Sequence, residues 1–497
     1  MAPPLPEYER HDALGLAALV ASGDVTPTEL VDAAIARIER DNPRLNAVVH
    51  TQFDRARAEA SGALPDGPFR GVPMLLKDLM AEDAGEPCTQ STQLLADYRP
   101  QRDAELVRRF RRAGLVVVGR TNTPEFGIYG VTEPVLRGPT RNPWNPAHTP
   151  GGSSGGSGAA VAAGMVPLAH GGDGGGSIRI PASHCGLVGL KPTRARNPAG
   201  PFAGERWAGL VCEHVLTRSV RDTAATLDAV SGPDVGAPYH APPRVGSFLG
   251  EVGAPPGRLR VAFTTRALFG TATHPDCVAA VEAAAALAAD LGHEVEQACP
   301  EYDQRAMVRA YFAIVAAGVN ASVRRAGELA GRRPRARDFE RPTWMLKLIA
   351  DKLTAAEYAG ALQTVQATGR GIGAFFGTWD VLLTPTAAQP PARVGEFALS
   401  GRERLLLGVL RALPARPLLL KALDDLADNA LSATPNTMLF NMTGQPAVSL
   451  PLHWNADGLP IGTQWVGRFG DEATLLRLAS QLEAARPWLG RRPEAPA

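Results

Sequence analysis

The chain has 497 residues, of which 45% are hydrophobic and 20% are charged, and its formal net charge is +1 at pH 7. Such a balanced charge argues against a nucleic-acid-binding protein and gives no general attraction to an anionic membrane. The length is sufficient to bury a large core, so the composition is typical of a soluble globular protein.

Five cysteines are spaced singly along the chain, at Cys88, Cys185, Cys212, Cys277 and Cys299. An odd number without a CxxC pair fits neither a disulfide framework nor a zinc site, so we expect reduced thiols in a cytoplasmic protein and no metal. The first residues, MAPPLPEYERHDALG, lack the basic and apolar regions of a signal peptide, and no uncharged apolar run is long enough to span a bilayer. Neither export nor a membrane span is therefore expected.

Residues 12–60 are predicted to be helical, because Thr26 can act as an N-cap, Pro27 suits the first helical position and Glu29 can close a capping box. Short apolar runs bounded by turn signals predict buried strands. These runs lie at 71–76, 114–119, 165–169, 259–263, 380–386, 447–452 and 460–467, and helical patterns lie between them, including 277–292 and 472–485. The alternation predicts an α/β layered fold with a largely buried sheet.

Residues 401–426, GRERLLLGVLRALPARPLLLKALDDL, are rich in leucine and basic residues. We expect a surface pair of helices that packs over the core or over a substrate entrance. A membrane-surface role is the alternative, although Pro414 and Pro417 interrupt the amphipathic pattern.

A glycine- and serine-rich run, TPGGSSGGSGAAVAAG, spans Thr149–Gly164. It is not a linker, because an apolar helix-like and strand-like segment follows it directly. It is not a phosphate-binding loop, because no lysine in the chain follows a glycine and the dinucleotide-binding spacing fails at Val161. The run also matches G-x-S-x-G, which nominates Ser153 as a nucleophile, but no predicted strand comes directly before it.

A second cluster, HGGDGGGSIRIPAS at His170–Ser183, follows the next predicted strand. Ser177 then lies at a strand-to-helix turn where glycine N–H groups can converge into an oxyanion hole. The alternative is a glycine-rich turn without chemistry. Lys77, one of five lysines, ends a predicted apolar strand and offers a base if burial lowers its pKa; the alternative is an exposed lysine at the strand end.

The stretches GVPMLLKD, GGSSGGSGAAVAAG and GGDGGGSIRIPASHCGLVGLKPT, in this order and with 24 residues from Ser153 to Ser177, resemble the amidase signature family. The flanking stretches GRTNTPEFG, RNPWNP and NMTGQPAVSLPL extend the resemblance over most of the chain, and it is closest to the branch of 6-aminohexanoate cyclic dimer hydrolases. The resemblance implies one amidase domain over 1–497, a single large α/β domain with a central mixed, mostly buried sheet covered on both faces by helices. Its parts would be a catalytic core at about 65–220, a helical and capping region at about 300–430, and C-terminal strands and helix at 435–490.

The resemblance also implies a Ser-cisSer-Lys triad: Ser177 as nucleophile, Ser153 as bridging serine after a cis bond from Gly152, and Lys77 as base. Backbone N–H groups would form the oxyanion hole, at Gly174, Gly175, Gly176 and Ser177. Asp173 and Arg179 would brace this loop, the alternative being an ordinary surface ion pair. One departure is Gly172, where many family members carry Thr or Ser.

The implied activity is hydrolysis of carbon–nitrogen bonds in small or oligomeric amides through a serine acyl-enzyme, without a cofactor. Linear or cyclic amides of the 6-aminohexanoate type are candidate substrates, with esters as side substrates. Candidate residues of the substrate pocket are Phe126, Ile128, Tyr129, Trp344 and Asn441. The alternatives are a glutaminase subunit of an amidotransferase and a non-catalytic ligand-binding relative. The expected partner is a small-molecule amide, and a homodimer is considered.

Overall fold

The computed structural model describes residues 5, 7–412, 414–421 and 434–494. An 11-stranded sheet runs through the centre of the molecule in the order β1-β3-β2-β4-β6-β5-β10-β11-β9-β7-β8. The strands are β1 (Val48–Thr51), β2 (Pro73–Lys77), β3 (Val116–Thr121), β4 (Leu168–Asp173), β5 (Val188–Lys191), β6 (Cys212–Thr217), β7 (Arg260–Phe263), β8 (Glu294–Gln297), β9 (Val381–Pro385), β10 (Ala447–Trp454) and β11 (Pro460–Gly467). Parallel pairs join β3, β2 and β4 at one side and β9, β7 and β8 at the other, with antiparallel pairs elsewhere. The predicted mixed sheet is confirmed.

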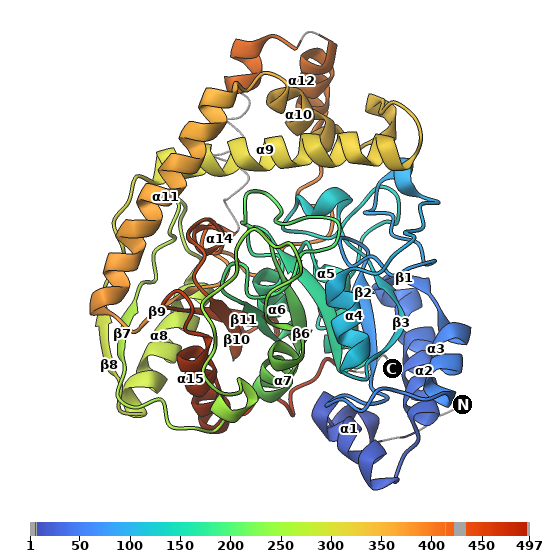
Figure 1. Cartoon of the computed structure of the whole chain (residues 1–497). Helices are drawn as coiled ribbons and strands as arrows, with labels where there is room; N and C mark the ends of the chain where they lie inside the picture. Colours follow the sequence, from blue (N-terminus) through green and yellow to red (C-terminus); the bar gives the residue numbers. More distant parts are fainter. Residues whose placement is uncertain (1–4, 6, 413, 422–433, 495–497) are drawn as a thin grey trace.

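Helices surround this sheet (Figure 1). They are α1 (Ala13–Ser22), α2 (Pro27–Leu45), α3 (Phe53–Ser61), α4 (Glu105–Arg112), α5 (Gly155–Ala162), α6 (Arg179–Cys185), α7 (Val220–Val230), α8 (Pro275–Asp290), α9 (Gln304–Leu329), α10 (Arg341–Ala350), α11 (Ala355–Thr378), α12 (Gly401–Ala412), α14 (Met438–Thr443) and α15 (Glu472–Ala485).

Burial on both faces of the sheet is clear at β9. Leu382 belongs to one apolar cluster, with α9, α11 and α14, whereas Val381 and Leu383 belong to another, with α7, α8 and α15. Since successive strand residues point to opposite faces, both faces of this strand are covered by helices. This explains why VLL reads as a continuous apolar run rather than as an alternating one.

The N-terminal segment departs from the prediction of one helical region. The Thr26 side chain accepts from the Glu29 N–H and the Glu29 carboxylate accepts from the Thr26 N–H, so the predicted capping box begins α2. However, β1 interrupts the helices, because residues 48–51 pair with β3 and form the edge strand of the sheet. Long-range pairing decides this strand, and local helix propensity does not.

The strand predicted at 165–169 begins and ends later than expected. Pro167 has no N–H to donate to a ladder, and β4 starts at Leu168. It then continues through His170, Gly171 and Gly172 to Asp173, because β6 pairs with it along its whole length. The glycine-rich loop therefore begins at the carboxyl end of β4, which is an interior strand of the sheet.

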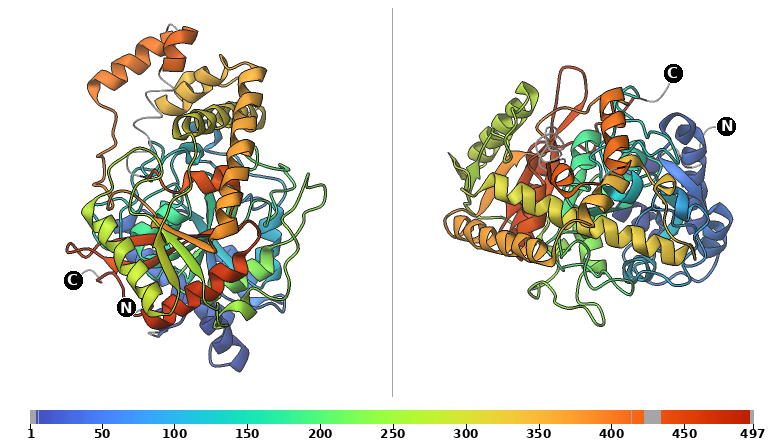
Figure 2. Two further views of the ribbon diagram at one scale, coloured as in Figure 1. Left: turned by 90° about the vertical axis from the view of Figure 1, so that its left-hand side faces the viewer. Right: turned by 90° about the horizontal axis from the view of Figure 1, so that it is seen from above.

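A layer of helices lies above the edge of the sheet where β2 and β4 end (Figure 1). The view from above in Figure 2 shows α9 crossing the molecule and α11 lying at one side of it. Among the described residues, α9 is long and apolar enough to cross a membrane by length and composition, yet 56% of its most apolar window is buried inside the protein. This burial is typical of a core helix of a soluble fold.

The leucine-rich segment 401–426 lies partly outside the described residues, at 413 and 422–426. Its first part is α12, and residues 416–421 are also helical. Arg341 of α10 donates to the carbonyl of Arg404 at 3.0 Å, while Leu405 is 71% and Leu418 50% exposed. The described part thus lies on the outer surface of the helical layer.

Candidate active site

Lys77 is the last residue of β2, and its side chain is completely buried. Its Nζ lies 2.7 Å from Ser153 Oγ, 3.0 Å from Ser154 Oγ and 3.4 Å from the carbonyl oxygen of Gly172. The strand ends of β2 and β4 are neighbours because the two strands are parallel, which brings Lys77 to the glycine-rich loop. The exposed-lysine alternative is therefore wrong.

The environment lowers the pKa of Lys77 to about 7. Burial lowers it by disfavouring the ammonium form, and the carboxylates of Asp173 and Glu213 partly oppose this effect. Two further groups contact the backbone of Lys77. Arg120 Nη1 donates to the Lys77 carbonyl at 3.1 Å, and the Lys77 N–H donates to His170 Nδ1 at 3.4 Å. A large fraction of Lys77 is consequently neutral, and able to accept a proton, near pH 7.

Ser153 follows a cis peptide bond from Gly152, as expected. It lies just before α5, and no described strand directly precedes it. A strand followed by a turn and a helix is found instead at Ser177, between β4 and α6, where the side chain is 9% exposed. The geometry required of a nucleophile elbow is thus at Ser177 and not at Ser153.

Ser154 was not singled out from the sequence, yet it touches every part of this arrangement. Its Oγ contacts Lys77 Nζ and both backbone groups of Gly172, and its N–H donates to the carbonyl of Ser177 at 3.2 Å. Its position beside Ser153 in the same run was the only sequence signal. It links Lys77 to the loop that carries Ser177.

Asp173 and Arg179 form a buried ion pair with both side chains 0% exposed, so the surface-pair alternative is wrong. Arg179 Nε and Nη2 each lie 2.9 Å from an oxygen of the carboxylate. Burial alone would raise the pKa of Asp173, but the charge and hydrogen bonds of Arg179, with the amide of Asn441, hold it well below its usual range. The carboxylate also accepts the N–H groups of Gly176 and Ile178, at 2.7 and 3.2 Å.

The expected oxyanion donors do not all remain free. The Gly176 N–H is committed to Asp173, whereas the N–H groups of Gly174, Gly175 and Ser177 donate to no acceptor within the described part of the chain. Gly176 has a φ of +132°, which strongly favours glycine. Three donors therefore stay available to bind negative charge at the turn.

The glycines of this loop leave room for side chains from distant segments. A Cβ at Gly174 would lie 2.9 Å from the Trp207 ring, one at Gly175 would lie 2.2 Å from Tyr311 Oη, and one at Gly176 would lie 2.2 Å from Thr437 Oγ1. At Gly172 a Cβ would lie 2.3 Å from Met80 Cε, the end of a flexible side chain that can move. Close packing, besides donor convergence, thus favours glycine at 174, 175 and 176 more strongly than at 172.

The candidate pocket residues fall into two groups. Phe126 stacks on Phe339 with ring centroids 5.9 Å apart, and Phe339 stacks on Trp344 at the same distance, so two predicted residues belong to one aromatic stack. Ile128 is partly exposed and packs against the apolar cluster that contains Phe126 and Phe339, and Tyr129 is also partly exposed. Asn441 is 1% exposed, and its side-chain amide is bonded to Asp173, Arg179 and the carbonyl of Leu210. It lies with the ion pair rather than with the aromatic stack.

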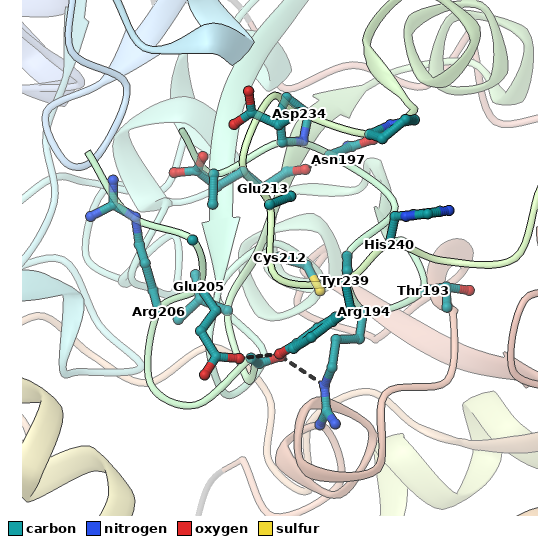
Figure 3. A pocket seen from close by; sticks show the side chains of 18 of the residues that line it. Thr193, Arg194, Asn197, Glu205, Arg206, Cys212, Glu213, Asp234, Tyr239 and His240 are labelled. Carbon is teal, nitrogen blue, oxygen red and sulfur yellow. Dashed lines mark hydrogen bonds between the residues drawn. The ribbon is translucent and has the colours of Figure 1, made fainter. Parts of the chain in front are cut away.

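A pocket adjoins the glycine-rich loop, since Val211 lines it and would lie 3.2 Å from a Cβ at Gly174. Glu213 and Arg206 lie on one side of this pocket and His240 on the other (Figure 3). In the sheet Glu213 pairs with Gly172, whose carbonyl is the one near Lys77. Burial raises the pKa of Glu213 to about 7, with Arg206 opposing this and Glu82 adding to it.

Among residues 5, 7–412, 414–421 and 434–494, no group of three or more His, Cys, Asp or Glu side chains is arranged to hold a metal ion. All five cysteines are free, and four of them are buried.

Comparison with known proteins identifies related chains. A family model described as Amidase matches residues 29–476. The chain is 41% identical to a 6-aminohexanoate-cyclic-dimer hydrolase of a Pseudomonas species and 41% identical to one of Paenarthrobacter ureafaciens; each alignment covers 97% of this chain and 96% of the relative. A solved structure of a 6-aminohexanoate cyclic dimer hydrolase complexed with substrate superposes with a TM-score of 0.90 at 40% identity, covering 98% of this chain and 99% of that one.

Proposed function

The chain belongs to the amidase signature family and is a hydrolase of amide bonds, and we propose that it cleaves them through an acyl-enzyme on Ser177. In this proposal Ser153 is the bridging serine and Lys77 the general base. The observation that carries it is the 2.7 Å contact of the buried Lys77 Nζ with Ser153 Oγ. A lysine with a pKa of about 7 matches the requirement for a base that works near neutral pH.

The proposed reaction is acyl transfer in two halves. Ser177 Oγ attacks the amide carbon while its proton passes to Ser153 and the Ser153 proton passes to Lys77, which becomes an ammonium. The tetrahedral oxyanion accepts hydrogen bonds from free loop N–H groups. The carbon–nitrogen bond then breaks, and the proton returns from Lys77 through Ser153 to the leaving amine. Water repeats the sequence on the ester, releases the acid and restores Ser177.

We propose linear or cyclic amides of the 6-aminohexanoate type as substrates, with esters as side substrates. The support is similarity over nearly the whole chain to hydrolases whose names specify a cyclic dimer of this kind. The aromatic stack of Phe126, Phe339 and Trp344, with Ile128 and Tyr129 beside it, is the proposed apolar wall for the methylene chain. Asn441 is proposed to act on the loop through Asp173 and Arg179.

The remaining expectations stay proposals. A cytoplasmic location is supported by the free cysteines, and a small molecule is the proposed partner. The homodimer considered from the sequence and the expected absence of a nucleic-acid partner also remain predictions. A glutaminase subunit is distinguished by its need for a partner protein, and a non-catalytic relative by the absence of turnover.

Labelling with a serine-directed fluorophosphonate tests the assignment. We expect the label on wild-type protein and on a folded Ser153→Ala variant at a reduced rate, but not on Ser177→Ala. Labelling that persists in Ser177→Ala and disappears in Ser153→Ala would make Ser153 the nucleophile instead. Incubation with a panel of cyclic and linear amides, with product analysis by mass spectrometry, identifies the substrate class.

A further inference from the structure

Each carbonyl group between Asp173 and Gly176 accepts a hydrogen bond, three of them from distant segments of the chain and one from α6. The Asp173 carbonyl accepts from Asn441 Nδ2 at 2.8 Å, that of Gly175 from Thr437 Oγ1, and that of Gly176 from the Ile180 N–H at 2.7 Å. The remaining one, the Gly174 carbonyl, accepts from Tyr311 Oη at 3.4 Å. Four different side-chain or backbone donors therefore fix the orientation of these peptide units.

In a trans peptide unit the carbonyl and the following N–H point in opposite directions. Among the described residues the only cis bonds are Gly152–Ser153 and Gly200–Pro201, so the Gly174–Gly175 unit is trans. A partner that holds the Gly174 carbonyl therefore sets the direction of the Gly175 N–H. That N–H is one of the three donors left free at the turn.

Tyr311 is placed to do this by α9, which crosses above the edge of the sheet (Figure 1). Its hydroxyl oxygen lies 2.2 Å from the position of a Cβ built at Gly175, and its ring packs edge-on against Phe312 with centroids 5.4 Å apart. The oxygen distance of 3.4 Å is at the long end for such a bond.

We propose that Tyr311 is a positioning residue for catalysis: its hydroxyl fixes the Gly174–Gly175 peptide unit so that the Gly175 N–H is directed at the oxyanion of the substrate. The proposal rests on the proposed role of Ser177 as nucleophile. Tyr311 lies 134 positions after Ser177, in α9, a helix without a catalytic motif.

The expected effect is confined to the transition state. Removing a complete oxyanion donor costs roughly 10²–10³ in rate, whereas Tyr311→Phe leaves the Gly175 N–H in place and removes only its restraint, so we expect kcat to fall about 10-fold. The affinity for the uncharged substrate should not change, because the carbonyl of the ground state carries little negative charge.

Two binding measurements separate this role from general packing. A boronic acid, which forms a tetrahedral adduct with a serine nucleophile, should bind Tyr311→Phe about 10-fold more weakly, in step with the loss in kcat/KM. The Kd of the amide substrate, measured on Ser177→Ala with and without Tyr311→Phe, should be the same. A structural role alone would weaken both ligands together.

Tyr302→Phe is the matched control. Its hydroxyl donates to the Leu268 carbonyl at 2.6 Å, so the same chemical group is removed from a shorter tyrosine-to-carbonyl bond elsewhere in the fold. We expect Tyr302→Phe to retain the wild-type kcat and the wild-type affinity for the boronic acid.

The outcomes are distinct. Loss of activity in Ser177→Ala, together with boronic acid binding by the wild-type protein, establishes the proposed nucleophile independently; without them both proposals fail. If they hold and Tyr311→Phe retains wild-type kcat, or loses affinity equally for the boronic acid and the substrate, the Tyr311 proposal alone is overturned.

Discussion

Lys77 and Ser153 meet through a 2.7 Å contact in a part of the protein where the lysine side chain has no exposed surface. An ammonium group in that position is costly, and its hydrogen-bond partners are hydroxyl and carbonyl oxygens without a formal charge. Burial without a carboxylate in contact therefore favours a neutral amine that accepts a proton during the reaction. The first two predictions follow from this state of the lysine.

The rate should depend on pH through the neutral fraction of Lys77. With a pKa of about 7, that fraction falls about tenfold for each pH unit below 7 and is nearly complete above 8, so kcat/KM should rise up to about pH 7 and then level off. Measuring kcat/KM from pH 5 to 9 checks this, with Lys77→Met expected to be inactive throughout. A flat profile with chemistry rate-limiting would argue against lysine as the base.

Glu213→Gln should move this profile to lower pH. The Glu213 carboxylate raises the pKa of Lys77, so its removal lets the lysine lose its proton more easily. Glu205→Gln is the control, since Glu205 lines the same pocket but accepts a hydrogen bond from Tyr239. Comparison of the three pH profiles gives the result, and a midpoint that stays in place in Glu213→Gln would contradict it.

Ser154→Ala should reduce kcat without abolishing it, by about 10-fold for the loss of one hydrogen bond to the lysine. Fluorophosphonate labelling of Ser177 should persist. Ser157→Ala is the control, because Ser157 Oγ bonds to Thr121 Oγ1 and the His170 carbonyl and does not touch Lys77. Complete inactivity of folded Ser154→Ala would assign it an essential part in proton transfer.

Arg179→Gln should destabilise the protein strongly. It leaves the Asp173 carboxylate buried without its cation, which typically costs about 3–5 kcal/mol in the free energy of unfolding. Urea denaturation followed by circular dichroism measures the change. The exposed pair of Arg57 and Asp32 provides the comparison, since Arg57→Gln should cost only about 0.2–1 kcal/mol. Similar losses in the two variants would show that burial of the pair adds nothing.

Gly175→Ala should inactivate the enzyme, and Tyr311→Phe should partly restore it. The new Cβ would lie 2.2 Å from Tyr311 Oη but 3.2 Å from Cζ, so removing the hydroxyl relieves the worst overlap. The kcat values of both single variants and the double variant form the cycle. Gly373→Ala in α11, where a Cβ would meet nothing within 4 Å, should retain activity and gain about 0.5–1 kcal/mol in stability. If the losses in kcat of the two single variants simply add in the double variant, the Gly175→Ala defect does not arise from overlap with the Tyr311 hydroxyl.

The sequence was most informative where chemistry is local. Thr26 and Glu29 predict the start of α2 because a capping box is closed by neighbours three residues apart. Lys77 and Ser177 could be selected because a lysine at the end of an apolar strand and a serine in a glycine-rich turn suit a base and a nucleophile, whereas the bridging role of Ser153 came from the family resemblance. Apolar runs such as the one in β9 likewise predict strands, since burial on both faces leaves a continuous signal.

Contacts between distant segments gave no such signal. β6 contains Cys212, Glu213 and His214 and does not read as a strand, because pairing with β4 decides its structure. Trp207, Tyr311 and Thr437 reach the glycine-rich loop from far along the chain, and each is a single residue in an unremarkable context. The commitment of the Gly176 N–H to Asp173 could also not be foreseen, since it depends on how the turn is folded.

The layer of helices above the sheet has a consequence for the smallest fragment that could work as an enzyme. Residues 65–220 contain Lys77, Ser153 and Ser177, but Tyr311, Thr437 and Asn441, which hold the carbonyls of the loop, lie outside them. A truncated protein of this length would keep every reacting side chain and lose the scaffold that orients the backbone donors. Transplanting the three motifs into another scaffold would therefore supply the proposed nucleophile but not the oriented backbone donors, and the rate of amide hydrolysis would stay low.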